Sequence, residues 1–309
     1  MMNKVICLMG PTSIGKTALS ISLCEQFNIE IVSIDSVMIY KEFNIGSAKP
    51  CSLTLKKYPH SMIDILEPWE TYSVALFYRD LLRNLDDIQK RGKIPLLVGG
   101  SMMYFKTFLL GGLSQMDEVS SQIRRKVNQM FEENGLEYLY KFLKKVDEES
   151  AKKVHHNDKY RIIRLAEIYF SNNKKKPSKI FNKCLENVQY YDTLNISIIP
   201  NDRSLLHTRI EQRLEKMLNE GFLDEVSSIK DRYPNKDLPA LRTIGYKEAN
   251  SYLEDRIDIE SMKSQILAST RQLAKRQITW LRHLDATTVF TLLDNGNILR
   301  RVDSFLHKN

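Results

Sequence analysis

An octapeptide near the N-terminus constrains this chain more than any other feature. Gly10-Pro11-Thr12-Ser13-Ile14-Gly15-Lys16-Thr17 fits the pattern Gly-x-x-x-x-Gly-Lys-Thr. An apolar run of strand character, residues 5–9, precedes it, and residues 18–27 carry apolar side chains at helical spacing. In this strand–loop–helix context, the backbone N–H groups of the loop and the helix N-terminus attract an anion. The octapeptide therefore predicts a di- or triphosphate site, with Lys16 as a mobile charge and the Thr17 hydroxyl as a ligand of bound Mg²⁺.

Length and composition narrow the class of protein. The 309 residues suit one large domain or two modest ones, and no apolar run approaches the ~20 residues that cross a bilayer, so we expect no membrane partner. Because the first predicted strand begins within a few residues of the N-terminus, we expect no removable signal. Scattered cysteines favour buried, reduced thiols in a cytoplasmic protein; they are Cys7, Cys24, Cys51 and Cys184. The net charge of +8 is weak evidence for a polyanionic partner.

Three zones follow one another along the chain. Residues 1–115 alternate strand signals, at 29–35 and 94–100, with an amphipathic helix at 72–90. Residues 116–190 are lysine-rich and show helical patterns only, at 121–131, 136–146 and 159–170. Residues 191–309 return to a strand, 194–200, followed by long helices at 203–220 and 262–284. We therefore predict an α/β fold: a P-loop core whose parallel sheet is flanked by helices, interrupted by an all-helical domain.

Polar residues at the ends of predicted strands are the candidates for chemistry. The strand 94–98 ends in Gly99-Gly100-Ser101, where ordinary phosphate-loop hydrolases place an aspartate that orders the metal. The nearest carboxylate at the end of a strand is Asp35. Because ligands of parallel sheets bind beyond the carboxyl ends of the strands, the octapeptide, Asp35 and Ser101 should surround one crevice. Asp35 can act there as a general base or order magnesium water, or it can cap a helix.

A basic segment near the C-terminus suits a nucleic-acid partner. Residues 275–282, Lys-Arg-Gln-Ile-Thr-Trp-Leu-Arg, contain no acid and several cations that suit phosphate contacts. Trp280 in this segment has two interpretations, stacking on a base or packing in the core.

Several motifs occur together and in order. Besides the octapeptide and residues 275–282, they are Asp35-Ser36 with Tyr40, Gly46-Ser47-Ala48-Lys49-Pro50, Val98-Gly99-Gly100-Ser101-Met102-Met103-Tyr104, His156-Asn157-Asp158 with Arg161 and Arg164, and Arg242-Thr243-Ile244-Gly245-Tyr246-Lys247. This set resembles the bacterial tRNA dimethylallyltransferase family (tRNA isopentenyltransferases, or IPP transferases). The resemblance covers residues 3 to 284 and leaves only the last 25 or so residues without a motif.

The resemblance implies an activity. Members transfer a dimethylallyl group from dimethylallyl diphosphate to the exocyclic N6 amine of the adenosine 3′-adjacent to the anticodon in tRNA, and they release diphosphate. The octapeptide, Gly10, Pro11, Thr12, Ser13, Ile14, Gly15, Lys16 and Thr17, would then hold the diphosphate leaving group, with Arg213 as a further contact. Lys16 and Mg²⁺ would stabilise the departing anion. Asp35 would accept the amine proton, and Ser101 would hydrogen-bond near the amine.

The resemblance also implies how tRNA binds. The target adenine must leave the anticodon stack, and the helical insertion would grip the anticodon arm. Met38 replaces a glutamine common in the family, so hydrogen-bonded readout by that side chain is lost. We expect a monomer. The implied tRNA contacts are Asp35, Ser36, Val37, Met38, Ser101, Arg124, Tyr160, Arg161, Ile162, Ile163, Arg164, Arg242, Thr243, Ile244, Gly245, Tyr246, Lys247, Lys275, Arg276, Gln277, Ile278, Thr279, Trp280, Leu281 and Arg282.

Three other functions compete with this one. A small-molecule phosphate-loop kinase would share the octapeptide, but the Gly-Gly-Ser strand end and the basic segment argue against it. An adenylate isopentenyltransferase would prenylate free nucleotide and would need no anticodon grip. An RNA-binding module without catalysis would not need Lys16, Thr17 and Asp35 together.

Overall fold

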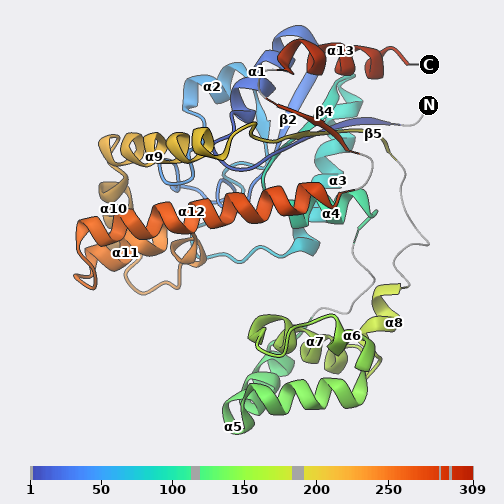
Figure 1. Cartoon of the computed structure of the whole chain (residues 1–309), viewed down its shortest axis with the longest axis vertical. Helices are drawn as coiled ribbons and strands as arrows, with labels where there is room; N and C mark the ends of the chain where they lie inside the picture. The colour runs from blue at the N-terminus through green and yellow to red at the C-terminus, as the bar shows by residue number, and fades with distance from the viewer. Residues whose placement is uncertain (1–2, 113–118, 183–190, 285–286, 292–293, 309) are drawn as a thin grey trace. The chain divides into compact units, whose positions relative to one another are not determined.

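The chain forms two compact units (Figure 1). The computed structural model describes residues 3–112, 119–182, 191–284, 287–291 and 294–308. Unit 1 comprises residues 1–106 and 190–309, and unit 2 comprises residues 107–189. The domain boundary predicted between residues 115 and 116 lies outside the described residues, as does residue 190, where the second boundary was predicted.

A six-stranded parallel sheet forms the centre of unit 1, in the order β3-β2-β4-β1-β5-β6. The α/β fold predicted from the sequence is therefore confirmed. Two short strands, β3 and β6, were not predicted. The strands are β1 (Lys4–Met9), β2 (Ile29–Ile34), β3 (His60–Ser61), β4 (Ile94–Gly99), β5 (Asp192–Ile198) and β6 (Thr288–Phe290).

The pairing of β1 decides where the polar residues meet. β1 lies between β4 and β5, and its residues Val5 to Met9 are fully buried, as apolar strands covered on both faces should be. Met9 of β1 and Ile34 of β2 are both in register with Gly99 of β4. The residues that follow these three strands therefore emerge at one edge of the sheet.

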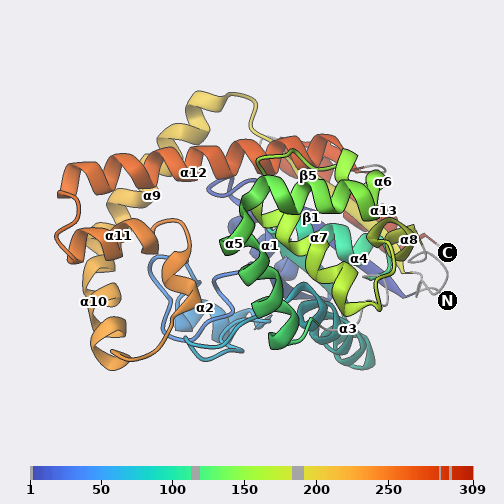
Figure 2. The same ribbon diagram turned by 90° about the horizontal axis from the view of Figure 1, so that it is seen from below.

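Helices cover the sheet of unit 1. One core cluster joins β1, β4 and β5 to α1, α9, α12 and α13, and α3 contacts β2 and β4. The long helix α12 runs beside α9 and α11 (Figures 1 and 2). The helices are α1 (Lys16–Gln26), α2 (Ser52–Lys57), α3 (Val74–Lys90), α4 (Met102–Leu109, which continues into unit 2), α9 (Arg203–Asn219), α10 (Phe222–Arg232), α11 (Tyr246–Leu253), α12 (Ile259–Arg282) and α13 (Asn295–Leu306).

A second core in unit 1 lies away from the sheet. It joins the segment after β2, through Ile39 and Phe43, to Phe222 of α10, Tyr246 of α11 and Met262 of α12. The two α-helices α10 and α11, with the 3₁₀ turn Pro239–Arg242 between them, are thereby attached to a loop that leads from β2 toward β3.

Unit 2 is helical throughout the residues that the structure describes. It contains α5 (Ser121–Val146), α6 (Glu148–Lys152), α7 (Lys159–Ser171) and α8 (Pro177–Asn182). α5 is interrupted at Gly135, where φ is 79°, so it matches the two shorter helices predicted at 121–131 and 136–146. α5 and α7 bury a small core that includes Val127, Leu139 and Ile162.

A buried carboxylate fastens the short helices of unit 2. Asp147 accepts hydrogen bonds from the backbone N–H and the hydroxyl of Ser150 and from those of Ser178. Burial acts to raise the pKa of Asp147, but these four hydrogen bonds outweigh it and hold the pKa below its ordinary value. Asp147 thus joins the start of α6 to the start of α8 and helps a lysine-rich segment to pack.

The cysteines differ from expectation in one respect. Cys7 is buried and Cys24 is partly buried, but Cys51 is exposed, so burial was wrongly predicted for Cys51. All three are free thiols, and Cys184 lies outside the described residues. No helix within the described part of the chain has the length and apolar character needed to span a bilayer.

Candidate active site

The octapeptide connects the end of β1 to the start of α1 and borders a cavity of 440 Å³. The other lining residues come from β2 and the segment that follows it, from β3, from β4 and Gly100, and from α1, α9 and α12. The first turn of α1 holds no acidic residue, and its N-cap, Gly15, has no side chain, so the N–H groups of this turn are left for a bound anion. The strand–loop–helix arrangement expected from the sequence is present, and phosphate binding by the loop stays a prediction.

Lys16 points its ammonium group back at the loop. Its Nζ donates to the carbonyl oxygens of Gly10, at 2.8 Å, and Pro11, at 2.7 Å. Burial of the ammonium group lowers the pKa of Lys16 to about 7; the charge of Asp35 opposes this shift, and the charge of Arg213 adds to it. The cavity therefore contains a cation that is costly to keep charged until an anion joins it.

Asp35 follows β2 directly and lines the same cavity. Its Oδ1 accepts the backbone N–H groups of Val37, at 2.8 Å, and Met38, at 3.1 Å. Residues 36–39 form a turn and not a helix, so the helix-capping role that the sequence left open is not found, and this oxygen caps the turn instead. No hydrogen bond to Oδ2 occurs among the described residues, and this second oxygen can accept a proton. Capping and base catalysis are compatible in one side chain.

The end of β4 has no room for a side chain. A Cβ atom on Gly99 would lie 2.0 Å from the carbonyl oxygen of Ile34 in the neighbouring strand. Position 99 therefore cannot hold an aspartate like the one that orders the metal in ordinary phosphate-loop hydrolases. Ser101 follows, half-buried, with its N–H directed at the Ile34 carbonyl at 3.4 Å. Gly99 and Gly100 line the cavity, whereas Ser101 is not among the described residues that do.

Helix α9 supplies positive charge to the cavity. Arg213 donates to the Thr12 hydroxyl, at 3.1 Å, and to the Ser47 carbonyl, at 3.3 Å, and burial lowers its pKa from the ordinary value. Arg209, which donates to the Ile14 carbonyl at 3.0 Å, and Lys216 also line the cavity. Sequence reasoning missed these two residues. Their spacing from Arg213, one helical turn on either side, was the signal that could have revealed them.

Gln277 has a structural position, although the resemblance assigned it to tRNA. It is buried in α12, where its Oε1 accepts the Thr12 N–H and its Nε2 donates to the Gly100 carbonyl, both at 2.9 Å. With both ends of the amide engaged, Gln277 connects the octapeptide to the end of β4. Gln277 therefore supports the site; because it also lines the cavity, its contact with tRNA stays a prediction.

The other implied tRNA contacts divide by exposure. Ile162, Tyr246, Ile278 and Leu281 are buried, so their side chains belong to cores and cannot meet an RNA in this structure. Partly or fully accessible residues include Asp35 to Met38, Ile163, and Thr243 to Ile244. Gly245 is buried. Trp280 is half-buried, with Lys106 Nζ 5.5 Å from its ring centre, so it is not a core residue. Exposed cations and polar side chains remain: Arg124, Tyr160, Arg161, Arg164, Arg242, Lys247, Lys275, Arg276, Thr279 and Arg282.

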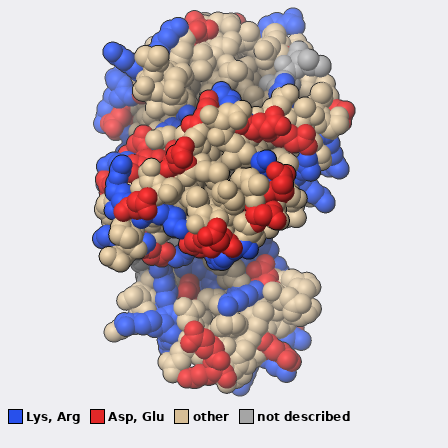
Figure 3. All heavy atoms as spheres, turned by 90° about the vertical axis from the view of Figure 1, so that its left-hand side faces the viewer, with Lys and Arg blue, Asp and Glu red and all other residues tan. Residues whose placement is uncertain are grey.

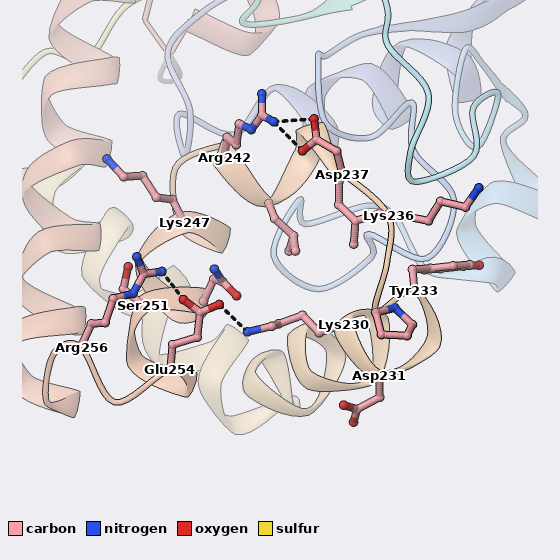
Figure 4. A pocket seen from close by; sticks show the side chains of 14 residues that line it. Lys230, Asp231, Tyr233, Lys236, Asp237, Arg242, Lys247, Ser251, Glu254 and Arg256 are labelled. Carbon is pink, nitrogen blue, oxygen red and sulfur yellow. Dashed lines mark hydrogen bonds and ion pairs between the residues drawn. The ribbon is translucent and has the colours of Figure 1, made fainter.

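A second pocket, of 750 Å³, lies beside α10 and α11 (Figure 4). Arg242 at its rim is paired with Asp237, and Glu254 is paired with both Lys230 and Arg256. Lys247 points away from these ion pairs in the same view.

Charges of both signs are also interspersed over the face of unit 1 seen in Figure 3. The net positive charge is therefore not gathered into one patch on that face.

The chain is similar to proteins of known activity. A family model described as "IPP transferase" matches residues 38–284. A tRNA dimethylallyltransferase of Legionella pneumophila strain Paris is 40% identical over 304 residues, which cover 98% of this chain and 95% of the relative. A second, of strain Corby, is 42% identical over 299 residues, 96% of this chain and 94% of the relative.

Solved structures agree with the sequence relatives. The full-length tRNA isopentenylpyrophosphate transferase from Bacillus halodurans superposes with a TM-score of 0.72 at 29% identity and covers 98% of this chain and 97% of its own. A eukaryotic dimethylallyltransferase acting on tRNA superposes with a TM-score of 0.83 at 29% identity, over 98% of this chain and 79% of its own. Because the family model and the relatives span most of the sequence, this chain belongs to the IPP transferase family.

Proposed function

We propose that this protein transfers a dimethylallyl group from dimethylallyl diphosphate to N6 of the adenosine 3′-adjacent to the anticodon in tRNA and releases diphosphate. One observation carries the proposal: a single cavity is lined by a phosphate loop and by the carboxylate of Asp35. The names of the relatives, tRNA dimethylallyltransferases, support this substrate pair. We further propose that the enzyme works as a cytoplasmic monomer.

Diphosphate departure is the step that the cavity favours. Breaking the allylic C–O bond places negative charge on diphosphate and positive charge on the allyl carbon. Lys16, the N–H groups at the start of α1 and Arg213 all border the cavity, where they stabilise the departing anion. Arg209 and Lys216 add positive charge on the same side.

The nucleophile must lose a proton. As N6 bonds to the allyl carbon, Asp35 takes the amine proton on the carboxylate oxygen that does not cap Val37 and Met38. Ser101, one residue beyond the cavity lining, is a candidate hydrogen-bond partner of the amine or the flipped base. Met38 lines the cavity and offers an apolar surface to a base.

The residues present fit a magnesium ion bound mainly through substrate. The Thr17 hydroxyl and the Asp35 carboxylate line one cavity, and both are the hard oxygen donors that Mg²⁺ prefers. Within the described residues, no group of three or more His, Cys, Asp or Glu is arranged to hold a metal. We propose that Thr17 ligates Mg²⁺ while diphosphate and water supply the other ligands. A magnesium ion held there would neutralise charge on the leaving group.

Exposed cations of both units are the proposed tRNA contacts. In unit 2, Tyr160 is 83% exposed and stands next to Arg161 and Arg164, an aromatic and basic group that suits a nucleic acid. In unit 1, Lys275, Arg276 and Arg282 project from the exposed side of α12. We propose that unit 2 grips the anticodon arm. An enzyme for free adenylate would not need these surfaces, and a kinase would not need Asp35 and Gly99 in this arrangement.

The direct test is prenyl transfer by the purified full-length protein. With dimethylallyl diphosphate and Mg²⁺, mass analysis of nucleosides should detect dimethylallyl adenosine in tRNA, and AMP should remain unmodified. Prenylation of AMP in place of tRNA would support the adenylate enzyme. Phosphate transfer from ATP without prenylation would support the kinase.

Asp35→Asn should slow transfer by about 10²–10⁴-fold, because the amide keeps the size and the capping oxygen but cannot take the proton. The affinity for tRNA should stay nearly unchanged. Single-turnover rates at saturating substrates, with tRNA binding measured in parallel, check this. Near wild-type turnover of the variant would mean that capping is the whole role of Asp35.

The affinity for dimethylallyl diphosphate should fall as the pH rises through about 7. Lys16 has a pKa of about 7, so its ammonium is charged below this pH and loses its charge above it. The diphosphate group itself becomes more anionic over this pH range, and this change alone would strengthen binding. The decline that we expect from Lys16 therefore has the opposite sign. Equilibrium binding from pH 6 to 9 tests this prediction, and Lys16→Ala should bind weakly without the decline. Steadily tighter binding by the wild type with rising pH would contradict it.

Arg161→Gln combined with Arg164→Gln should raise the KM for tRNA several-fold and lower the salt slope of tRNA binding by roughly two units if both contact phosphates. Dimethylallyl diphosphate affinity should hold. Lys152→Gln with Lys153→Gln is the matched control, since it removes the same charge from exposed residues of unit 2. If both double variants lose the same tRNA affinity, the loss reflects the net charge of unit 2 and not specific contacts of Arg161 and Arg164.

A further inference from the structure

Residues 44–48 connect the diphosphate cavity to the second core of unit 1. Ser47 and Ala48 line the cavity, and the Ser47 carbonyl accepts a hydrogen bond from Arg213 at 3.3 Å. The same guanidinium donates to Thr12 of the octapeptide. The position of the Arg213 guanidinium therefore depends on the conformation of this segment.

A single carboxylate holds the other side of the segment. Glu225, in the first turn of α10, accepts the backbone N–H groups of Asn44, at 2.9 Å, Ile45, at 2.7 Å, and Gly46, at 3.1 Å. Its Oε1 also accepts the hydroxyl of Tyr246 at 2.7 Å. Three successive N–H groups that converge on one anion form a concave backbone arrangement that is unstable without its acceptor.

Tyr246 closes this arrangement from the opposite side. Its ring is fully buried and lies 4.8 Å from that of Phe43 and 5.2 Å from that of Phe222, between ring centres. Burial and the neighbouring Glu225 raise the pKa of the Tyr246 hydroxyl, so it remains a donor. A Cβ atom on Gly46 would lie 2.4 Å from atoms of both Phe222 and Tyr246, so the segment packs this closely only with glycine.

We propose that Glu225 is a positioning residue for diphosphate, which acts by holding residues 44–46 so that the Ser47 carbonyl orients Arg213 toward the phosphate loop. Tyr246 supports Glu225 in this role. The buried Tyr246 thus serves the diphosphate side of the reaction and not tRNA. The inference rests on the proposed function in one respect, since it takes Arg213 to contact the diphosphate.

Glutamine at position 225 cannot reproduce these contacts. The two carboxylate oxygens each accept two hydrogen bonds, whereas an amide offers one oxygen and replaces the other by an N–H₂ donor. At least one backbone N–H would then face a donor. Glu225→Gln should loosen residues 44–46 with little change in side-chain volume.

The test compares Glu225→Gln with Asp224→Asn, which removes the same charge from the same first turn of α10 at an exposed side chain. Binding of inorganic diphosphate and of dimethylallyl diphosphate is measured by calorimetry, and steady-state kinetics give kcat and both KM values. For Glu225→Gln we expect about tenfold weaker binding of both ligands, the scale of one lost charge-assisted hydrogen bond, and an unchanged KM for tRNA. Asp224→Asn should match the wild type.

Tyr246→Phe is a milder second variant that keeps the ring and removes one hydrogen bond. It should also weaken diphosphate binding, but by a smaller factor than Glu225→Gln. If Glu225→Gln does not fold, the diphosphate affinity of Tyr246→Phe tests the proposal. In an Arg213→Gln background, Glu225→Gln should cause no further loss, because it acts through Arg213.

Two results would overturn the proposal. One is unchanged diphosphate affinity in folded Glu225→Gln, and the other is a full additional loss in the Arg213→Gln background. A separate outcome concerns the proposed function alone. If the wild type binds diphosphate but prenylates no tRNA, that function fails, while the diphosphate affinities still decide the role of Glu225.

Discussion

The parallel pairing of β1 with β4, and of β4 with β2, is the constraint on which the candidate site depends. It places Gly10, Asp35 and Gly100, which are far apart in sequence, at one edge of the sheet. The register also explains the composition of these strand ends. Gly99 approaches the Ile34 carbonyl so closely that no side chain fits at this position. The carboxylate at this edge of the sheet is therefore Asp35, which follows β2. At position 99 this strand contact leaves no room for an aspartate.

Charge within the cavity follows from the same geometry. Lys16, Arg213, Arg209 and Lys216 surround a space that contains one carboxylate, Asp35, among its lining residues. Without an anion, Lys16 donates to two loop carbonyls and its pKa falls to about 7. A bound diphosphate would replace the two carbonyl partners of the Lys16 ammonium by oxygens that carry full negative charge. This excess of cations over carboxylates in the lining supports the proposal that the cavity takes an anionic leaving group.

Sequence patterns predicted the parts of this fold that are local. The octapeptide with its flanking strand and helix is contiguous, and the buried strand 94–99 and the amphipathic helix 74–90 show their periodicity within one window. The strands β3 and β6 are too short to show a period. Burial was the main source of error. Gln277 and Tyr246 lie in motifs with exposed neighbours, and only tertiary packing reveals that their polar atoms face the protein interior.

This division by burial changes how the motifs are understood. In Arg242 to Lys247, the outer residues Arg242 and Lys247 are exposed, whereas Tyr246 points inward to Glu225. In Lys275 to Arg282, Lys275 and Arg276 are exposed, whereas Gln277 points inward to Thr12 and Gly100. Each motif therefore has exposed cations on its outer side and a buried polar side chain on its inner side. Gln277 bonds to two residues that line the 440 Å³ cavity, whereas Tyr246 bonds to Glu225, which lies outside that lining. In α12 the exposed Arg276 and the buried Gln277 are successive residues of one helix, so a partner bound to Arg276 would act beside the hydrogen bonds that connect Gln277 to Thr12 and Gly100.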